Sequence, residues 1–333
     1  MNTKKATILL ALLRTAVAGL AALTVWPAIA QQGDWPVRPV RWIVPFPPGG
    51  ANDLVARLVA QKLGERWGRP VVIDNRAGAG GNLGTETGAK AAPDGYTLTV
   101  ASTSTLGSNV GLNPKLPFDP VRDFAPIALF VTAPNLLAVH PSVAAASVQD
   151  LITLAKKSPG KLNYSSFGDG SSAHLVGEMF RSQAGVDIVH VPYKGGGPAL
   201  AAVMAGEVQM TFSNLSVALP QVRAGKVRGL AVTSRKRALA LPELPTVAES
   251  GLPDFEATAW VGLVAPRALP AALVQRLNRE IRELLAEPEM RNQILSRGLE
   301  PADTTPDAFG RWIRADIERW KKVIRVAGIR VQS

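Results

Sequence analysis

Two glycine-rich turns, each between a strand-like run and a helix-like run, hold the residues best suited to bind a ligand. The first is Pro47-Pro-Gly-Gly-Ala-Asn-Asp53, and the second is Gly168-Asp-Gly-Ser-Ser172. The start of a helix offers unsatisfied N–H groups and about half a positive charge, so it binds a carboxylate or phosphate without a cationic side chain. We expect the two turns to hold an anionic ligand from opposite sides. Such turns also occur as ordinary connections capped by Ser or Asn.

A third turn of this kind, Tyr193 to Pro198, also joins a strand pattern to a helix pattern. Proline suits the first turn of the helix that follows it. Phe46, just before the first turn, is predicted to form an apolar wall. The predicted ligand-binding residues are therefore Phe46, Gly49, Gly50, Ala51, Asn52, Thr132, Gly168, Ser171, Ser172, His174, Gly195 and Gly196.

Catalytic, metal and cofactor sites find little support in the sequence. There are three histidines, but no G-x-S-x-G nucleophile elbow and no H-E-x-x-H zinc motif. His174 and Glu178 are spaced i,i+4 on a predicted helix, without a visible third metal ligand. The glycines from Gly78 to Gly84 lack the G-x-G-x-x-G spacing, and no phosphate-binding G-x-x-x-x-G-K-[ST] loop occurs. We expect no metal and no cofactor.

Composition narrows the class of protein. The chain has 333 residues, 47% of them hydrophobic and 19% charged, and it has no cysteine. This length favours two lobes around separate cores, and the missing cysteines exclude disulfides and thiolate metal sites. The formal net charge of +11 comes from scattered Lys and Arg without an aromatic ladder. Nucleic acid is therefore not an expected partner.

The first thirty residues are typical of a secretory signal peptide. Lys4, Lys5 and Arg14 precede an apolar run to Val25, and Ala28-Ile-Ala30 matches a small-residue cleavage site. The apolar run is too short for a membrane anchor, which needs about 20 residues. We predict cleavage after Ala30, a mature protein that begins at Gln31, and a soluble periplasmic location.

Downstream, β-rich runs alternate with helix patterns, which predicts an α/β fold with mostly parallel strands. The runs are 40–46, 70–74, 97–101, 127–131, 136–139, 162–165, 188–191, 208–212, 229–233 and 260–264. Apolar spacing predicts helices after Asn52, around 273–284 and over 306–326, and Gly68 is a plausible end for the first. A proline turn near Pro134 and a loop before Trp260 are predicted to mark two crossings between lobes. The lobes are then 31–132 with 258–333, and 133–257.

Several segments, in order along the chain, resemble the Bug family, the periplasmic solute-binding receptors of tripartite tricarboxylate transporters. They are Pro45-Phe-Pro-Pro-Gly-Gly-Ala-Asn-Asp53, Asn75-Arg-Ala-Gly-Ala-Gly-Gly81, Ala92-Pro-Asp-Gly-Tyr-Thr97, Gly168-Asp-Gly-Ser-Ser-Ala-His-Leu175 and Val191-Pro-Tyr-Lys-Gly195. Asn52 departs from the family, in which Ser or Thr often precedes the aspartate. The resemblance implies a two-lobed periplasmic-binding-protein (Venus flytrap) fold that closes on a small organic ligand, with membrane transport components as partners.

The sequence favours a mono- or dicarboxylate ligand, because the two main turns contain no Arg or Lys for a more highly charged anion. Lys194 lies close enough in sequence to contribute. A sensor-kinase ectodomain is a further candidate partner, and the protein is expected to be a monomer. The alternative function is a periplasmic hydrolase or isomerase that uses the same cleft, with His174 or Asp169 as the base.

Overall fold

The computed structural model describes residues 35–113 and 115–329, and the chain from Arg38 onward belongs to one compact unit. The predicted signal peptide, residues 1–30, and the predicted new N-terminus at Gln31 lie outside the described residues. Among the helices that the structure describes, none combines the length and the apolar character needed to cross a bilayer.

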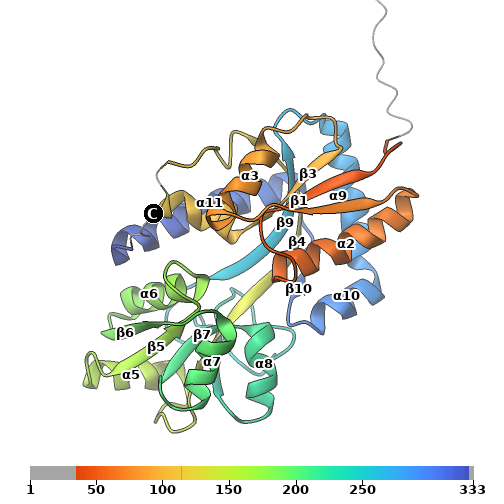
Figure 1. Cartoon of the computed structure of the whole chain (residues 1–333). Helices are drawn as coiled ribbons and strands as arrows, with labels where there is room; N and C mark the ends of the chain where they lie inside the picture. Colours follow the sequence, from red (N-terminus) through yellow and green to blue (C-terminus); the bar gives the residue numbers. More distant parts are fainter. Residues whose placement is uncertain (1–34, 114, 330–333) are drawn as a thin grey trace, which may run out of the picture. The chain divides into compact units, whose positions relative to one another are not determined.

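The described chain from Arg38 onward is built on a mixed, ten-stranded sheet with strand order β2-β1-β3-β9-β4-β7-β5-β6, and β8 and β10 pair with β4 outside this path. Figure 1 shows helices along the whole length of this sheet. The strands are β1 (Val40–Val44), β2 (Val71–Asn75), β3 (Thr97–Ser102), β4 (Phe124–Val139), β5 (Leu162–Ser166), β6 (Ile188–Pro192), β7 (Met210–Asn214), β8 (Arg228–Val232), β9 (Thr258–Pro266) and β10 (Glu300–Pro301). All ten predicted runs lie at least partly in strands, and the two-residue β10 was not predicted.

The strand directions correct the prediction of a mostly parallel sheet. β1 pairs in parallel with β2 and β3, and β5 pairs in parallel with β6 and β7. In contrast, β4 is antiparallel to β7, β8, β9 and β10, and β9 is antiparallel to β3. Strands joined by helical crossovers pair in parallel at the two ends, whereas β4 and β9 run in opposite directions through the middle.

The predicted proline turn at Pro134 is wrong, because β4 continues through it as one strand of 16 residues. Pro134 is the last residue of β4 that pairs with β9, and Asn135 is the first that pairs with β7. Proline has no N–H to donate to a sheet ladder, so it is tolerated where a strand changes partners. The predicted loop before Trp260 is also shorter than expected, since β9 already begins at Thr258. The lobe boundaries after 132 and 257 stay a prediction; the first falls inside β4.

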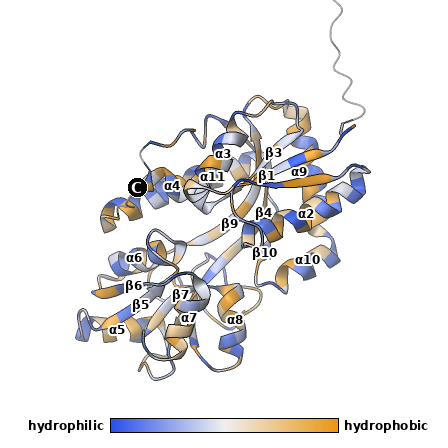
Figure 2. Cartoon of the chain, viewed as in Figure 1, coloured by the Kyte–Doolittle hydropathy of each residue, from blue (hydrophilic) through white to orange (hydrophobic). Residues whose placement is uncertain are grey.

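Helices cover both parts of the sheet. Their bounds are α2 (Ala51–Trp67), α3 (Asn82–Ala89), α4 (Asn109–Leu112), α5 (Val148–Lys157), α6 (Ser172–Ala184), α7 (Gly196–Met204), α8 (Leu215–Arg223), α9 (Ala271–Ala286), α10 (Pro288–Leu295) and α11 (Pro306–Ala327), with a 3₁₀ turn η2 (Ala79–Gly81) and a π-helical turn η3 (Thr103–Ser108). Gly68 ends α2 in the left-handed conformation, as predicted. Figure 2 shows hydrophobic and hydrophilic residues interspersed along the helices, the mixture expected of helices with one face on a core.

The last helix, α11, contributes to two separate hydrophobic cores. Its first half packs Phe309, Ile313 and Ile317 against the core that contains Trp260 and Phe124. Its second half packs Trp320, Val323 and Ile324 against the core that contains Tyr164 and Phe212. The helix that apolar spacing predicts over 306–326 therefore buries these side chains in one stripe, and Trp312 is half-buried. One helix therefore packs against both hydrophobic cores, at the two ends of the sheet.

Candidate functional site

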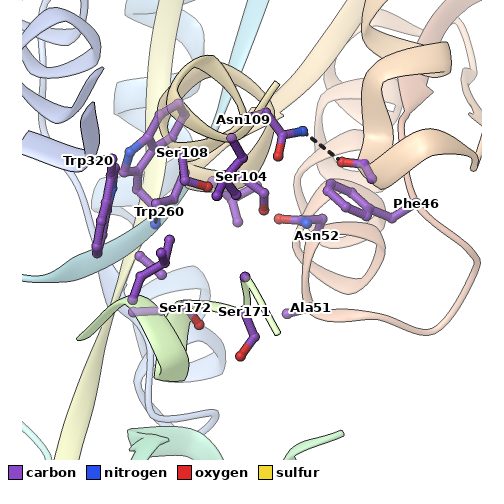
Figure 3. A pocket seen from close by; sticks show the side chains of 18 of the residues that line it. Phe46, Ala51, Asn52, Ser104, Ser108, Asn109, Ser171, Ser172, Trp260 and Trp320 are labelled. Atoms are coloured by element: carbon purple, nitrogen blue, oxygen red, sulfur yellow. Dashed lines mark hydrogen bonds between the residues drawn. The ribbon is translucent and has the colours of Figure 1, made fainter. Parts of the chain in front are cut away.

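A single large cavity brings the two main predicted turns together. It encloses about 1180 Å³ and is lined from the starts of α2 and α6, from η3, α4 and β9, and from Trp320 of α11. Figure 3 shows Asn52, Ser104 and Ser171 around the same space, with Trp260 and Trp320 on one side. Of the predicted ligand-binding residues, the lining includes Phe46, Ala51, Asn52, Ser171 and Ser172.

The start of α2 presents backbone donors to this cavity. Its N-cap is Gly50, which has no side chain to accept a hydrogen bond, and the first intrahelical bond runs from Leu54 N to Gly50 O. The N–H groups of Ala51 and Asn52 therefore have no protein acceptor among the described residues, and both residues line the cavity. This helix start can bind an anion through its backbone.

Asp53 fixes this helix start and does not face the ligand space. It is 1% exposed, and its carboxylate accepts hydrogen bonds from Gly49 N at 2.9 Å, Arg57 Nε at 2.9 Å and Asn75 Nδ2 at 2.8 Å. Burial alone would raise the pKa of Asp53, but the hydrogen bonds from Arg57, Gly49 and Asn75 outweigh it and hold the pKa below its ordinary value. The ionised carboxylate thus anchors the turn to β2.

The start of α6 is capped differently. The Ser171 hydroxyl accepts from His174 N at 3.4 Å, and Gly170 N donates to His174 Nδ1 at 3.0 Å. Ser171 N donates to Gly168 O at 3.2 Å. The Ser172 N–H, its hydroxyl and the Ala173 N–H are left without a partner among the described residues. Ser172, more than Ser171, is therefore free to bind a ligand.

Behind this turn, two histidine rings stack face to face. The His174 and His190 ring centroids lie 3.8 Å apart with an angle of 2° between the planes, and Asp169 Oδ1 lies 3.7 Å from His190 Nδ1. Burial lowers the pKa of both rings, that of His190 to about 4 with a further contribution from the charge of His174. Ring nitrogens bind a metal in the ring plane, so two parallel rings cannot direct their lone pairs at one ion between them. Asp169, His174 and His190 are close enough together to suggest a metal site, but the stacked rings are not oriented to bind one ion.

His190 also forms part of a serine, histidine and aspartate arrangement. Its Nε2 lies 2.6 Å from Ser166 Oγ. However, Ser166 is fully buried and does not line the cavity, and its hydroxyl donates to Gly168 O at 3.1 Å. A nucleophile must reach its substrate, and this serine instead ties β5 to the turn before α6. The arrangement acts as a structural support for that turn.

The remaining predicted residues do not line the cavity. Gly49 and Gly50 precede α2, and Gly168 and His174 flank the α6 turn. Gly195 and Gly196 start α7, also without a side-chain cap, and Gly196 lies against Phe167. Thr132 lies in β4 opposite Trp260 and Glu300. Ligand contact stays a prediction for all twelve residues.

One whole wall of the cavity, which follows β3, was not predicted from the sequence. Thr103, Ser104, Ser108 and Asn109 line it from η3 and α4. The side chain of Asn109 donates to Asn82 Oδ1 at 2.8 Å and to Gly80 O at 3.0 Å, which ties α4 to η2. The run Ser-Thr-Ser-Thr-Leu-Gly-Ser-Asn after a buried strand was the available signal, because it is rich in hydroxyl groups and lacks helical periodicity.

A buried carboxyl supports the wall formed by the two tryptophans. Asp316 of α11 is fully buried and accepts from Trp260 Nε1 at 2.8 Å and from Arg319 Nη1 at 3.0 Å. Burial raises the pKa of Asp316 to about 6, although the Trp260 hydrogen bond and the Arg319 charge oppose the shift. Arg319 Nη2 also lies 3.3 Å from Glu256 Oε2, just before β9. The indole of Trp260 is therefore fixed in position at the cavity.

Comparison with known proteins gives a consistent family. The profile of the tripartite tricarboxylate transporter family receptor (TctC) matches residues 55–329. Protein BugT of Bordetella pertussis is 37% identical over 319 residues, which is 95% of this chain and 98% of BugT. A UPF0065 protein from the tcbD-tcbE intergenic region of Pseudomonas sp. strain P51 is 39% identical over 93% of each chain.

Solved structures agree with the fold. "R. palustris Rpa4515 with adipate" matches with a TM-score of 0.75 at 39% identity, covering 89% of this chain and 99% of that one. "MatC (Rpa3494) from Rhodopseudomonas palustris with bound malate" matches with a TM-score of 0.71 at 34% identity, covering 87% and 100%. The predicted α/β fold of the periplasmic-binding-protein type is confirmed.

Proposed function

Because this chain belongs to the tripartite tricarboxylate transporter receptor family, whose members are periplasmic solute-binding receptors, we propose that it captures a small mono- or dicarboxylate in the cavity described above. It then delivers this ligand to the membrane components of a tripartite tricarboxylate transporter. Capture and release leave the ligand chemically unchanged.

One observation carries the proposal: the N-termini of α2 and α6 line the same cavity, and both have backbone donors to spare. Ala51 and Asn52 stand at one helix start and Ser172 at the other. Each helix start stabilises a negative group by its unsatisfied N–H groups and its dipole. The cavity lining contains no arginine among the described residues, so the site suits an acid of low charge better than a phosphate or a tricarboxylate.

The structurally similar proteins support the same ligand class. The two related structures named above hold adipate and malate, both dicarboxylates. The cavity of about 1180 Å³ is large for such ligands, since pockets that enclose drug-sized molecules span about 300–1,000 Å³. We therefore propose that the two lobes close on the ligand, so that both helix starts reach it.

The first test is a ligand screen with mono-, di- and tricarboxylates and their amides, read by thermal shift and by native mass spectrometry of gently purified protein. A cognate acid at 100 times its Kd stabilises the folded state by about 2.7 kcal/mol, which raises Tm by several degrees. Recovery of an intact carboxylate supports the receptor. Recovery of turnover products would support the alternative of a hydrolase or isomerase, and binding of neutral amides alone would contradict the ligand class.

Delivery is tested separately with the membrane components reconstituted in vesicles. Uptake of the identified acid should require the receptor. A liganded receptor that supports no uptake, yet binds a sensor-kinase ectodomain, would assign it to signalling. Sedimentation of the free protein checks the expectation that it works as a monomer.

A further inference from the structure

Two charged side chains occur in the cavity lining of the described chain, and they have opposite signs. Asp169 lies on the turn before α6, beside His190, and Lys115 follows α4 on the wall built by η3 and α4. An acidic ligand is attracted by Lys115 and repelled by Asp169. With one acid group held at the two helix starts, a second acid group is therefore favoured on the η3 and α4 wall, near Lys115, over the side of the cavity where Asp169 lies.

Lys115 is available to a ligand. Its backbone N–H donates to Asn113 Oδ1 at 3.0 Å, which ties down the turn that follows α4. Its side chain is exposed, and no carboxylate lies within ion-pair distance of it in the part of the chain that the structure describes. A lysine ammonium is a flexible point charge with three donors, so it can meet a carboxylate from several directions.

Its place on the wall separates it from the backbone donors of α2. Ser104, near the start of η3, and Asn52, near the start of α2, both line the cavity (Figure 3). Lys115 comes eleven residues after Ser104 and beyond Leu112, the last residue of α4, and it also lines the cavity. One acid group at the α2 start thus leaves room for a second acid group near Lys115.

We propose that Lys115 binds the second acid group of a dicarboxylate and so makes the site prefer diacids to monoacids. This inference rests on the proposed function, because it needs a carboxylate in the cavity. The sequence motifs do not include Lys115, and Lys194, the lysine that the sequence placed near the site, does not line the cavity.

The test compares Lys115→Gln with the wild type by calorimetry. The probes are succinate, glutarate and adipate, and the monoamide of whichever diacid binds the wild type best. The monoamide has the same length and one charge fewer. An exposed charged hydrogen bond is screened, so we expect about a tenfold loss of diacid affinity and less than a twofold change for the monoamide. Lys194→Gln removes the same charge outside the cavity and should change neither, and Lys115→Arg should retain the preference.

Each result has one meaning. A wild type that binds none of the acids contradicts the proposed function, and this inference with it. A wild type that binds diacids, while Lys115→Gln loses nothing or loses diacid and monoamide affinity equally, overturns the inference alone. Raised salt should also reduce diacid affinity more in the wild type than in Lys115→Gln, because the lost interaction is between charges.

Discussion

Replacing Asp53 by asparagine should cost more stability than the same change at an ordinary helix start. The difference measures how much the buried carboxylate contributes by anchoring the α2 turn. Asp53 stands at the third position of α2 and accepts from the amide of Gly49. Asp150 stands at the third position of α5 and accepts in the same way from the amide of Ala146 at 3.1 Å. Asp53 is buried and has two further donors, whereas Asp150 is exposed. The pair is therefore a matched comparison.

The expected loss of stability follows from the hydrogen bonds that the new asparagine side chain in Asp53→Asn can keep. Its amide oxygen can still accept from Gly49 and Arg57, but its NH₂ group then faces the Asn75 Nδ2 donor. Turning Asn75 around does not help, because its Nδ2 also donates to Phe46 O and its Oδ1 accepts from Arg57. One charge-assisted hydrogen bond and the ionic partner of Arg57 are lost. We expect Asp53→Asn to lower the free energy of unfolding by about 2–4 kcal/mol.

Urea unfolding followed by circular dichroism measures this loss, with an unchanged m-value as a check that the denatured state is the same. Asp150→Asn should cost much less. Calorimetry with a bound acid should also show weaker binding for Asp53→Asn, since the turn that presents Ala51 and Asn52 loses its anchor. Equal losses of stability in the two variants, or a loss below about 1 kcal/mol in Asp53→Asn, would refute the reasoning.

Three further outcomes are expected. Ser172→Ala should weaken acid binding, measured by calorimetry, with little loss of stability. Ser171→Ala should lower the free energy of unfolding, measured in urea, by about 1 kcal/mol, because an N-cap is lost. If calorimetry showed weaker binding for Ser171→Ala than for Ser172→Ala, Ser171 would be the ligand contact instead. The unfolded-state pKa of His190 is near 6.5 and its folded pKa is about 4, so the contribution of His190 to stability should fall as the pH falls from about 6.5 to about 4. The raised pKa of Asp316 acts in the opposite direction below about pH 6, so the measurement is the free energy of unfolding of the wild type minus that of His190→Gln, and this difference should decrease as the pH falls through the same range. Small-angle scattering should give a smaller radius of gyration with a saturating acid, and an unchanged radius would contradict closure.

The outer parts of the fold could be predicted from local patterns. The α11 stripe and the Gly68 end of α2 follow from apolar spacing and a left-handed glycine, which depend on neighbours in sequence. The middle of the sheet could not. Proline reads as a strand breaker in isolation, and its tolerance at Pro134 depends on the change of partner from β9 to β7, which only the assembled sheet reveals.

The site divides in the same way. Turns with helix starts are visible as glycine patterns, so Ala51, Asn52 and Ser172 could be predicted. Trp260 and Trp320 reach the cavity from β9 and α11, 60 residues apart in sequence, and each has an ordinary core pattern around it. The hydroxyl-rich wall after β3 was missed because a π-helical turn has no familiar periodicity.

The contrast between backbone donors and cavity side chains suggests how such a site can keep one class of ligand, the carboxylates, while the particular acid that it binds changes. The backbone donors of α2 and α6 exist because of the fold, and almost any side chain at those positions leaves them in place, so affinity for one acid group comes with the architecture. On the η3 and α4 wall, the side chains of Ser104 and Lys115 line the cavity outside the sheet and the hydrophobic cores, so they can change without disturbing either. We therefore expect the main chain to recognise the acid group and the η3 and α4 wall to decide the choice among acids.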